Sequence, residues 1–436
     1  ISLMYQAVSY HKRTNTVHIW DDEKGHVQIK YKPYAYRKSS YGRLVALDGQ
    51  TVDKVYNPGD EEGLYESDLN PEMRTLIDLY TDSDEASVGH RTLFIDIEVD
   101  IANGFPTPEE AQNEVTSIAI YDEAGDQRCV WILDKDNVVE NISKPGYEVV
   151  SCQNEHTLLQ KFLYKYYEIQ PTIITGWNID FFDIPYLYNR MVQILGEDLA
   201  RSLSPIKDVI WLKHRNRYRI SGVSCLDYMA LYKNFTYSQE SSYSLEAISQ
   251  KELGKGKMKY EGTLDDLMRN DIQGYIDYNM NDVDLVWEID QKMKLIDLAR
   301  SICHKGHVPY EDFLFPTRYL DGAALTYLKR LNIVSPSRRP RSNEELNLLG
   351  AYVKSPNPGR YKWVYDLDLT SLYPSIIMTL NISPETKVTK LEKFDGHAYV
   401  KNTASHYSDG WNGWETTKDL RDYLEKNKYS IAANGV

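Results

Sequence analysis

The sequence predicts a multidomain protein of the α/β class, and three observations lead to that prediction. The chain has 436 residues, which at roughly 100–200 residues a domain suggests two to four domains. Hydrophobic residues make up 42% of the chain and charged residues 26%, as in folded globular proteins. Strand-like and helical patterns alternate between residues 91 and 299, which is typical of an α/β domain.

Residues 1–90 predict a separate N-terminal domain of mixed α+β type. Strand-like runs occupy residues 4–10 and 16–22, and loop-rich acidic sequence follows them. The polar run at 81–85 is typical of a solvated linker. We expect residues 300–340 to complete this domain.

Residues 91–299 contain the clearest secondary-structure patterns. The run TLFIDIEV at 92–99 is apolar and β-branched, which indicates a buried central strand. Apolar residues recur at three- and four-residue intervals from 272 to about 298, which predicts one long helix. Two apolar runs around a polar centre at 209–220 predict a β-hairpin with a basic tip at 213–217. Further strands are expected at 114–122, 128–134 and 171–178, and helices at 155–167 and 184–195.

Charge and cysteine content narrow the class of protein. A net charge of −14 argues against a protein that coats DNA irrespective of sequence, because such proteins are basic. No apolar run approaches the ~18 residues of a membrane span, and no secretory leader is visible. The four cysteines are isolated from one another, so neither a zinc site nor a disulfide framework is indicated. We therefore expect a reducing, cytoplasmic setting. Because the first residue is Ile, we also expect that some N-terminal sequence is missing.

Two acids stand on the predicted central strand. Asp96 and Glu98 are separated by one residue, so both side chains project from the same face. Like charges held this close repel each other unless a cation lies between them, and Mg²⁺ favours oxygen ligands of this kind. The alternative is a strand end at which both acids simply face water.

Two later segments each add an acid. Asp183 follows a predicted strand and a Gly turn and stands at the start of a predicted helix, where the alternative is an N-cap. Tyr278 and Asp282 are four residues apart and share one face of the predicted long helix. There a phenol could orient a water beside a carboxylate that holds a metal. The alternative is a surface contact.

In this order and setting, D-I-E, N-x3-F-D and Y-x3-D resemble the three exonuclease motifs of the family B DNA polymerases. The resemblance implies a ribonuclease-H-like fold for residues 91–299 and a two-metal 3′→5′ exonuclease that proofreads DNA. It implies two Mg²⁺ ions, or Mn²⁺ in their place, and a tyrosine, Tyr278, that positions the attacking water. The metal ligands would be Asp96, Glu98, Asp183 and Asp282. Asn178 and Phe182 would contact the terminal nucleotides of the DNA.

Residues 368–377, DLTSLYPSII, resemble the first palm motif of the same family. The resemblance implies that residues 341–436 begin a polymerase palm. It implies that Asp368 binds the catalytic Mg²⁺ and that Ser371, Leu372 and Tyr373 bind the incoming nucleotide. A strand is expected at 361–369, leading into this motif.

The polymerase motifs that should follow do not occur in the sequence. Neither a K-x3-N-S-x-Y-G helix nor a D-T-D-S-type turn is present, and a single palm carboxylate cannot hold two metals. Nucleotidyl transfer is therefore expected to need a partner polypeptide with fingers, the rest of the palm and a thumb, unless the chain is a fragment of a longer protein.

The expected partners are DNA primer–template and single-stranded 3′ ends, with no membrane. The motifs resemble in sequence those of the replicative polymerases of large tailed phages, and this resemblance implies that the protein is located in the cytoplasm of the host cell. By the same resemblance Lys213, Arg215 and Arg217 at the hairpin tip would contact DNA, although an exposed basic turn is the alternative. Two other functions remain open: a non-catalytic DNA-binding or structural half of a split polymerase, and a free-standing exonuclease that acts on RNA ends.

Overall fold

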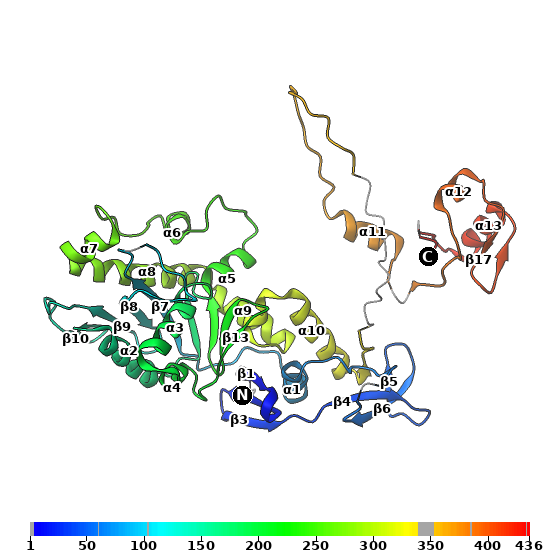
Figure 1. The fold of residues 1–436 in the computed structure, drawn as a ribbon. Helices are drawn as coiled ribbons and strands as arrows, with labels where there is room; N and C mark the ends of the chain where they lie inside the picture. Colours follow the sequence, from blue (N-terminus) through cyan, green and yellow to red (C-terminus); the bar gives the residue numbers. More distant parts are fainter. Residues whose placement is uncertain (1–3, 60, 103, 339–352, 384–385, 433) are drawn as a thin grey trace. The chain divides into compact units, whose positions relative to one another are not determined.

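The computed structural model describes residues 4–59, 61–102, 104–338, 353–383, 386–432 and 434–436 (Figure 1). The chain divides into two units, Ile1–Ser342 and Asn343–Val436. Within the described ranges, no helix combines the length and the apolar character that a bilayer crossing requires.

A mixed sheet of seven strands forms the centre of the first unit. In spatial order the strands are β10 (Ile142–Lys144), β11 (Tyr147–Cys152), β9 (Gln127–Leu133), β8 (Val115–Asp122), β7 (Thr92–Val99), β12 (Ile173–Gly176) and β15 (Ser224–Asp227). β7 runs antiparallel to β8 and parallel to β12, so it lies inside the sheet. The predicted strand at 92–99 is confirmed at both ends.

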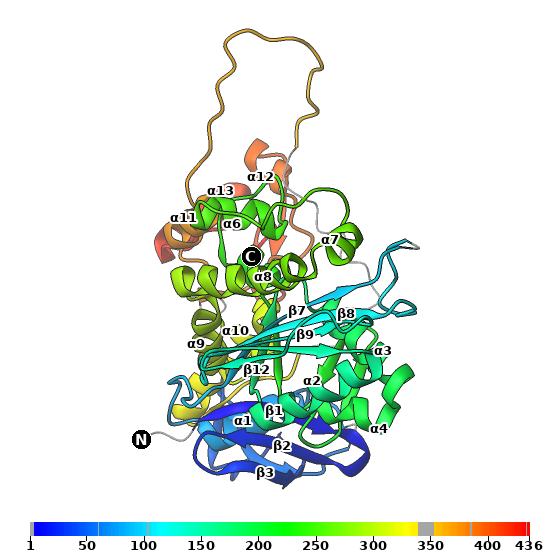
Figure 2. The ribbon, with the colours of Figure 1, turned by 90° about the vertical axis from the view of Figure 1, so that its left-hand side faces the viewer.

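Helices cover both faces of this sheet (Figures 1 and 2). They are α2 (Glu155–Ile169) and α3 (Asp183–Leu195) on one face and α8 (Ile272–Met293) on the other. The odd-numbered residues of β7, from Leu93 to Val99, share a buried core with α2 and α3, whereas Phe94 shares a core with α8. Because side chains alternate along a strand, Asp96 and Glu98 point to the same face as Phe94, toward α8.

The prediction of one helix from 272 to about 298 is wrong at its C-terminal end. α8 stops at residue 293 and α9 (Leu295–Gly306) begins two residues later. Lys294 between them adopts a left-handed conformation, with φ of +54°. The buried Asp290 carboxylate accepts a hydrogen bond from the Ile296 backbone N–H at 3.3 Å. This side-chain contact stabilises the start of the second helix, and apolar periodicity cannot reveal it.

Two small sheets and one helix make up the N-terminal region. The first sheet is the antiparallel set β1 (Tyr5–His11), β2 (Thr16–Asp21) and β3 (Gly25–Lys30). The second contains, in order, β16 (Ile333–Val334), β5 (Leu44–Ala46), β6 (Thr51–Tyr56) and β4 (Tyr34–Lys38). α1 (Pro71–Tyr80) begins at Asn70, whose side chain accepts from the Met73 N–H. Because β16 pairs with β5, residues far apart in the sequence meet in the second sheet.

The remaining elements of the first unit surround the large sheet. β13 (Val209–Leu212) and β14 (Arg217–Ile220) pair antiparallel, which confirms the predicted hairpin. The other helices are α4 (Glu197–Ala200), α5 (Tyr228–Phe235), α6 (Leu245–Leu253), α7 (Leu264–Asn270) and α10 (Pro316–Arg330), with 3₁₀ turns at Lys12–Thr14, Arg201–Leu203 and Tyr310–Leu314. All four cysteines of the chain, Cys129, Cys152, Cys225 and Cys303, lie buried in this unit as free thiols.

The second unit has little core of its own. Its described residues form α11 (Leu372–Leu380), α12 (Gly396–Lys401), α13 (Thr417–Asn427) and the short pair β17 (Tyr407–Ser408) and β18 (Gly413–Trp414). Leu391, Tyr407, Trp414 and Leu420 form a small buried cluster. The predicted strand at 361–369 is wrong, since these residues form neither strand nor helix. A strand needs a hydrogen-bonded neighbour, and within the described residues of this unit no segment pairs with 361–369.

Candidate active site

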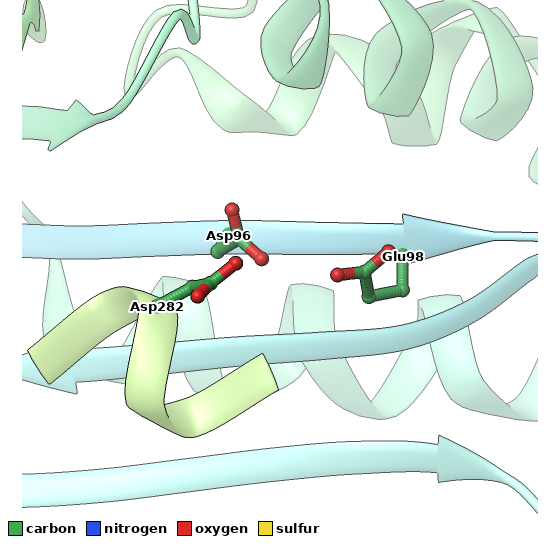
Figure 3. Close-up of side chains that lie close together, drawn as sticks. All are labelled: Asp96, Glu98 and Asp282. Carbon is green, nitrogen blue, oxygen red and sulfur yellow. The ribbon is translucent and has the colours of Figure 1, made fainter. Parts of the chain in front are cut away.

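Three carboxylates meet between β7 and α8 (Figure 3). Ligand oxygens of Asp96 and Glu98 from β7 and of Asp282 from α8 lie within 4.8 Å of one another. Asp282 is only 2% exposed, and its Oδ1 has no hydrogen-bond partner among the described residues. A buried acceptor without a donor is costly, and a divalent cation is the partner that oxygens of this kind prefer. The donor set therefore fits a cation such as Mg²⁺.

The electrostatics of the cluster lead to the same conclusion. Burial, and then the Asp282 carboxylate, raise the pKa of Glu98 to about 8. Burial and the carboxylates of Asp282, Asp183 and Glu98 raise the pKa of Asp96 well above its usual range. A cation between these groups would favour their ionised forms.

Asp183 approaches the cluster from a second direction. It is the first residue of α3, is 4% exposed, and accepts a hydrogen bond from the Ile97 backbone N–H at 3.1 Å. Ile97 separates Asp96 from Glu98 in the sequence, so this bond fixes Asp183 beside them. The N-cap alternative for Asp183 is not supported, because its carboxylate binds the strand and Phe182 is the capping residue of α3.

The turn after β12 makes this approach possible. β12 pairs with β7 only as far as Thr175 and Phe94, and the chain leaves the sheet after Gly176, which still pairs with Asp227 on β15. A Cβ atom on Gly176 would lie 2.3 Å from the Ile95 carbonyl oxygen, so only glycine permits the close contact. The predicted Gly turn before Asp183 thus has a steric cause.

A lysine that sequence reasoning did not assign to the site lies among the acids. Lys257 Nζ donates to Asp282 Oδ2 at 2.6 Å and to the Tyr278 hydroxyl at 3.2 Å. Burial alone would lower the pKa of Lys257, but the Asp282 and Asp96 carboxylates raise it above its ordinary value. The signal in the sequence was a run of four lysines at 251–259, which equally indicates an exposed basic face. Tyr278 lies one helical turn before Asp282, as expected.

Aromatic side chains lie next to the carboxylates. Phe182 directly precedes Asp183 and packs against Phe105 and Tyr186, with ring centroids 5.2 and 5.4 Å apart. Phe105 is 73% exposed, so most of its side chain is open to solvent. Asn178 has a left-handed backbone, with φ of +66°, and its N–H donates to a buried Asp227 carboxylate at 3.2 Å.

The basic hairpin tip is less available to DNA than its sequence suggests. Arg217 forms an ion pair with Asp180 at 3.0 Å, with side chains only 7% and 6% exposed. Arg215 forms an ion pair with Asp312, also at 3.0 Å. These internal pairs argue against DNA contacts for Arg217 and Arg215, whereas Lys213 is exposed and stays a predicted contact.

The predicted nucleotide-binding residues of the second unit are all exposed. Asp368 lies in a segment without regular structure, and Ser371 immediately precedes α11 with φ of +53°. Leu372 and Tyr373 open α11 and are exposed. In the part of the chain that the structure describes, Asp368 belongs to no group of three potential metal ligands.

Comparison with known proteins identifies two matching family descriptions and a set of relatives. "DNA polymerase family B, exonuclease domain" matches residues 65–248, and "DNA polymerase family B" matches residues 320–422. The chain is similar to the DNA-directed DNA polymerase of Escherichia phage RB69, with 36% identity over 346 residues that cover 73% of this chain and 38% of the relative. The corresponding protein of Enterobacteria phage T4 is 34% identical over 363 residues, covering 76% and 40%. DNA polymerase II of Escherichia coli (strain K12) is 27% identical over 309 residues, covering 65% and 36%. Each match thus spans about two fifths of the relative's length.

Proposed function

Because this chain belongs to DNA polymerase family B, we propose that its residues 91–299 act as a 3′→5′ exonuclease that proofreads DNA with two divalent cations. The observation that carries the proposal is the cluster of Asp96, Glu98 and Asp282 with Asp183 fixed beside it. The matched exonuclease range, 65–248, contains three of these acids. Geometry adds Asp282, which lies outside that range.

The proposal includes a ribonuclease-H-like fold for the same residues. It is supported by the mixed seven-stranded sheet with helices on both faces. It is also supported by the origin of the acids, two from a strand inside the sheet and one each from two helices on opposite faces.

Each side chain of the site has a proposed part in the reaction. Bound Mg²⁺ or Mn²⁺ would supply positive charge that lowers the pKa of the attacking water and offsets the charge that develops on the phosphate. The four carboxylates would hold the cations. The Tyr278 hydroxyl would orient the water, and Lys257 offsets the charge of Asp282. Phe182 and Phe105 would stack on unpaired terminal bases, with Asn178 contacting the same end of the strand.

The test is mononucleotide release from DNA. The chain is incubated with 5′-labelled single-stranded and 3′-recessed DNA and Mg²⁺, and products are resolved on a denaturing gel. We expect stepwise shortening from the 3′ end, abolished in Asp96→Ala and retained in Asp136→Ala, an exposed acid of the same domain. Intact DNA with the parent chain would contradict the proposal and favour a non-catalytic, DNA-binding half of a polymerase. Degradation of RNA but not DNA would favour an RNA exonuclease.

We also propose that nucleotidyl transfer needs further polymerase sequence, supplied by a polypeptide with fingers, the rest of the palm and a thumb. Trp363, Tyr365 and Leu367 are 96%, 81% and 83% exposed, and folded proteins rarely leave such an apolar stretch uncovered. Added dNTPs should therefore give no primer extension by this chain alone, whereas extension would contradict the proposal. Since two relatives are phage polymerases, the proposed location is the cytoplasm of a host cell.

A further inference from the structure

We infer that Asn279, held in place by Ser117, is a positioning residue that fixes the Asp96 carboxylate for cation binding. Asn279 Nδ2 donates to Asp96 Oδ2 at 2.6 Å, and Ser117 Oγ donates to Asn279 Oδ1 at 2.7 Å. The inference rests on the proposed exonuclease and adds to it two residues that neither ligate a cation nor touch the substrate.

The direction of both hydrogen bonds follows from the chemistry of the groups. A carboxylate only accepts, so the amide must present its NH₂ group to Asp96. The amide oxygen then faces the other way, where the Ser117 hydroxyl donates to it. Asn279 and Ser117 are both fully buried, at 0% exposure, so solvent does not compete for these bonds. The serine therefore selects the amide orientation that restrains Asp96.

Pairing with β7 turns Ser117 toward α8, because directly opposite residues of neighbouring strands share a face of the sheet. Ser117 lies directly opposite Glu98 on β7, and the register shifts immediately beyond Glu98, so Thr116 has no partner there. Such bulges redirect side chains and are common beside active sites. Here both bulge residues reach α8: Thr116 Oγ1 lies 2.7 Å from the Tyr275 hydroxyl, and Ser117 bonds Asn279. A regular strand would turn Thr116 to the opposite face and leave Ser117 where it is.

The expected consequence is a loss of cation affinity rather than a loss of fold. Asp96 lies near Asp282, Asp183 and Glu98, whose charges oppose its own. Without the Asn279 amide, nothing on α8 holds the Asp96 carboxylate against that repulsion. Residues that orient metal ligands in this way typically contribute about 10- to 100-fold to metal affinity when they are removed.

The test measures Mn²⁺ binding directly, by electron paramagnetic resonance titration of the full chain. Asn279→Ala should weaken the site lost in Asp96→Ala by about 10-fold or more, and Ser117→Ala should weaken it in the same direction by a smaller factor. Thr116→Val is the matched control, because it breaks the neighbouring β8–α8 contact and leaves the Asn279–Asp96 bond in place. The exonuclease rate of Asn279→Ala should recover as Mn²⁺ is raised, since all four ligands remain.

Three outcomes separate the inference from the proposed function. If Asn279→Ala and Ser117→Ala both bind Mn²⁺ as tightly as the parent while Asp96→Ala does not, the inference is wrong and the exonuclease stands. If Thr116→Val weakens binding as much as Ser117→Ala, general loosening of α8 is the cause and the inference is also wrong. If the parent has no Mn²⁺ site that Asp96→Ala removes, the proposed metal centre fails, and the inference fails with it.

Discussion

Replacing Arg217 with Met should destabilise the first unit and leave DNA binding unchanged. Arg217, in the strand pair next to the hairpin turn, is buried against Asp180 with an N–O distance of 3.0 Å. Asp180 belongs to the turn that leads from β12 to Asp183, so the ion pair joins the hairpin to that turn. The family resemblance implied a DNA contact for this arginine, with an exposed basic turn as the alternative.

The size of the effect follows from the geometry of the pair. Two unit charges 3.0 Å apart attract by about 5 kcal/mol at an effective dielectric constant of ~20. Removing one partner of a buried pair typically costs about 3–5 kcal/mol, because the other charge stays buried and unpaired. Burial raises the pKa of Asp180 even though Arg217 opposes this, so Asp180 can take up a proton when the arginine is lost. We therefore expect Arg217→Met to lower the free energy of unfolding by about 3 kcal/mol, at the lower end of that range.

Urea unfolding followed by circular dichroism measures this loss. If the free energy of unfolding falls by about 3 kcal/mol per molar urea, the urea concentration at the unfolding midpoint should fall by about 1 M. Arg217→Met combined with Asp180→Asn should recover part of the loss, because no charge is then buried. Lys213→Met at the exposed tip is the matched control and should leave the midpoint unchanged.

A stable Arg217→Met variant would refute this reasoning. If its free energy of unfolding lies within about 0.5 kcal/mol of the parent, while its affinity for single-stranded DNA falls and the salt dependence of binding decreases, then Arg217 contacts phosphate. The side chain would then have to leave its pair with Asp180 when DNA binds.

Two other perturbations test the packing of the first unit. Burial lowers the pKa of His90 to about 2 and that of His304 to about 3, whereas histidines in an unfolded chain titrate near ~6.5. Below that pH the unfolded chain therefore binds more protons than the folded chain, so the free energy of unfolding decreases as the pH falls. We expect the free energy of unfolding to fall by about 1 kcal/mol per histidine between pH 6.5 and 5.5. The measurement compares the pH dependence of the urea midpoint in the parent and in His90→Gln, and an identical pH dependence in both proteins would contradict the expectation. Gly176→Ala would place a Cβ atom 2.3 Å from the Ile95 carbonyl oxygen. It should therefore lower the free energy of unfolding by about 1–3 kcal/mol and remove most of the exonuclease rate. An unchanged Tm with an unchanged rate would show that the turn can move without consequence.

The sequence predicted the local parts of the site well because each depends on spacing along one element. The strand at 92–99 was predicted at both ends, and two-residue spacing correctly put Asp96 and Glu98 on one face. Four-residue spacing likewise put Tyr278 one turn before Asp282. Periodicity carries this information because it reflects which face of an element is buried.

The parts that the sequence did not predict depend on contacts between distant residues. Nothing near Lys257 in the sequence indicates that its ammonium group lies against Asp282. The charge of Arg217 suggested an exposed contact, but its partner Asp180 becomes visible only when the hairpin is folded onto the turn. The helix predicted through Lys294 fails for a local reason that apolar periodicity does not show, since the buried Asp290 carboxylate accepts a hydrogen bond from the Ile296 backbone N–H.

The four buried cysteines make the chain suited to site-specific chemical labelling. Thiolate is the reactive form of cysteine, and burial raises the pKa of Cys129 to about 12 and raises the pKa values of Cys152, Cys225 and Cys303 as well. A maleimide dye should therefore react with a cysteine introduced at the surface long before it reaches these native thiols. One such cysteine in place of Asn216, exposed at the hairpin tip, would give a fluorescent reporter of hairpin movement without removal of any native cysteine.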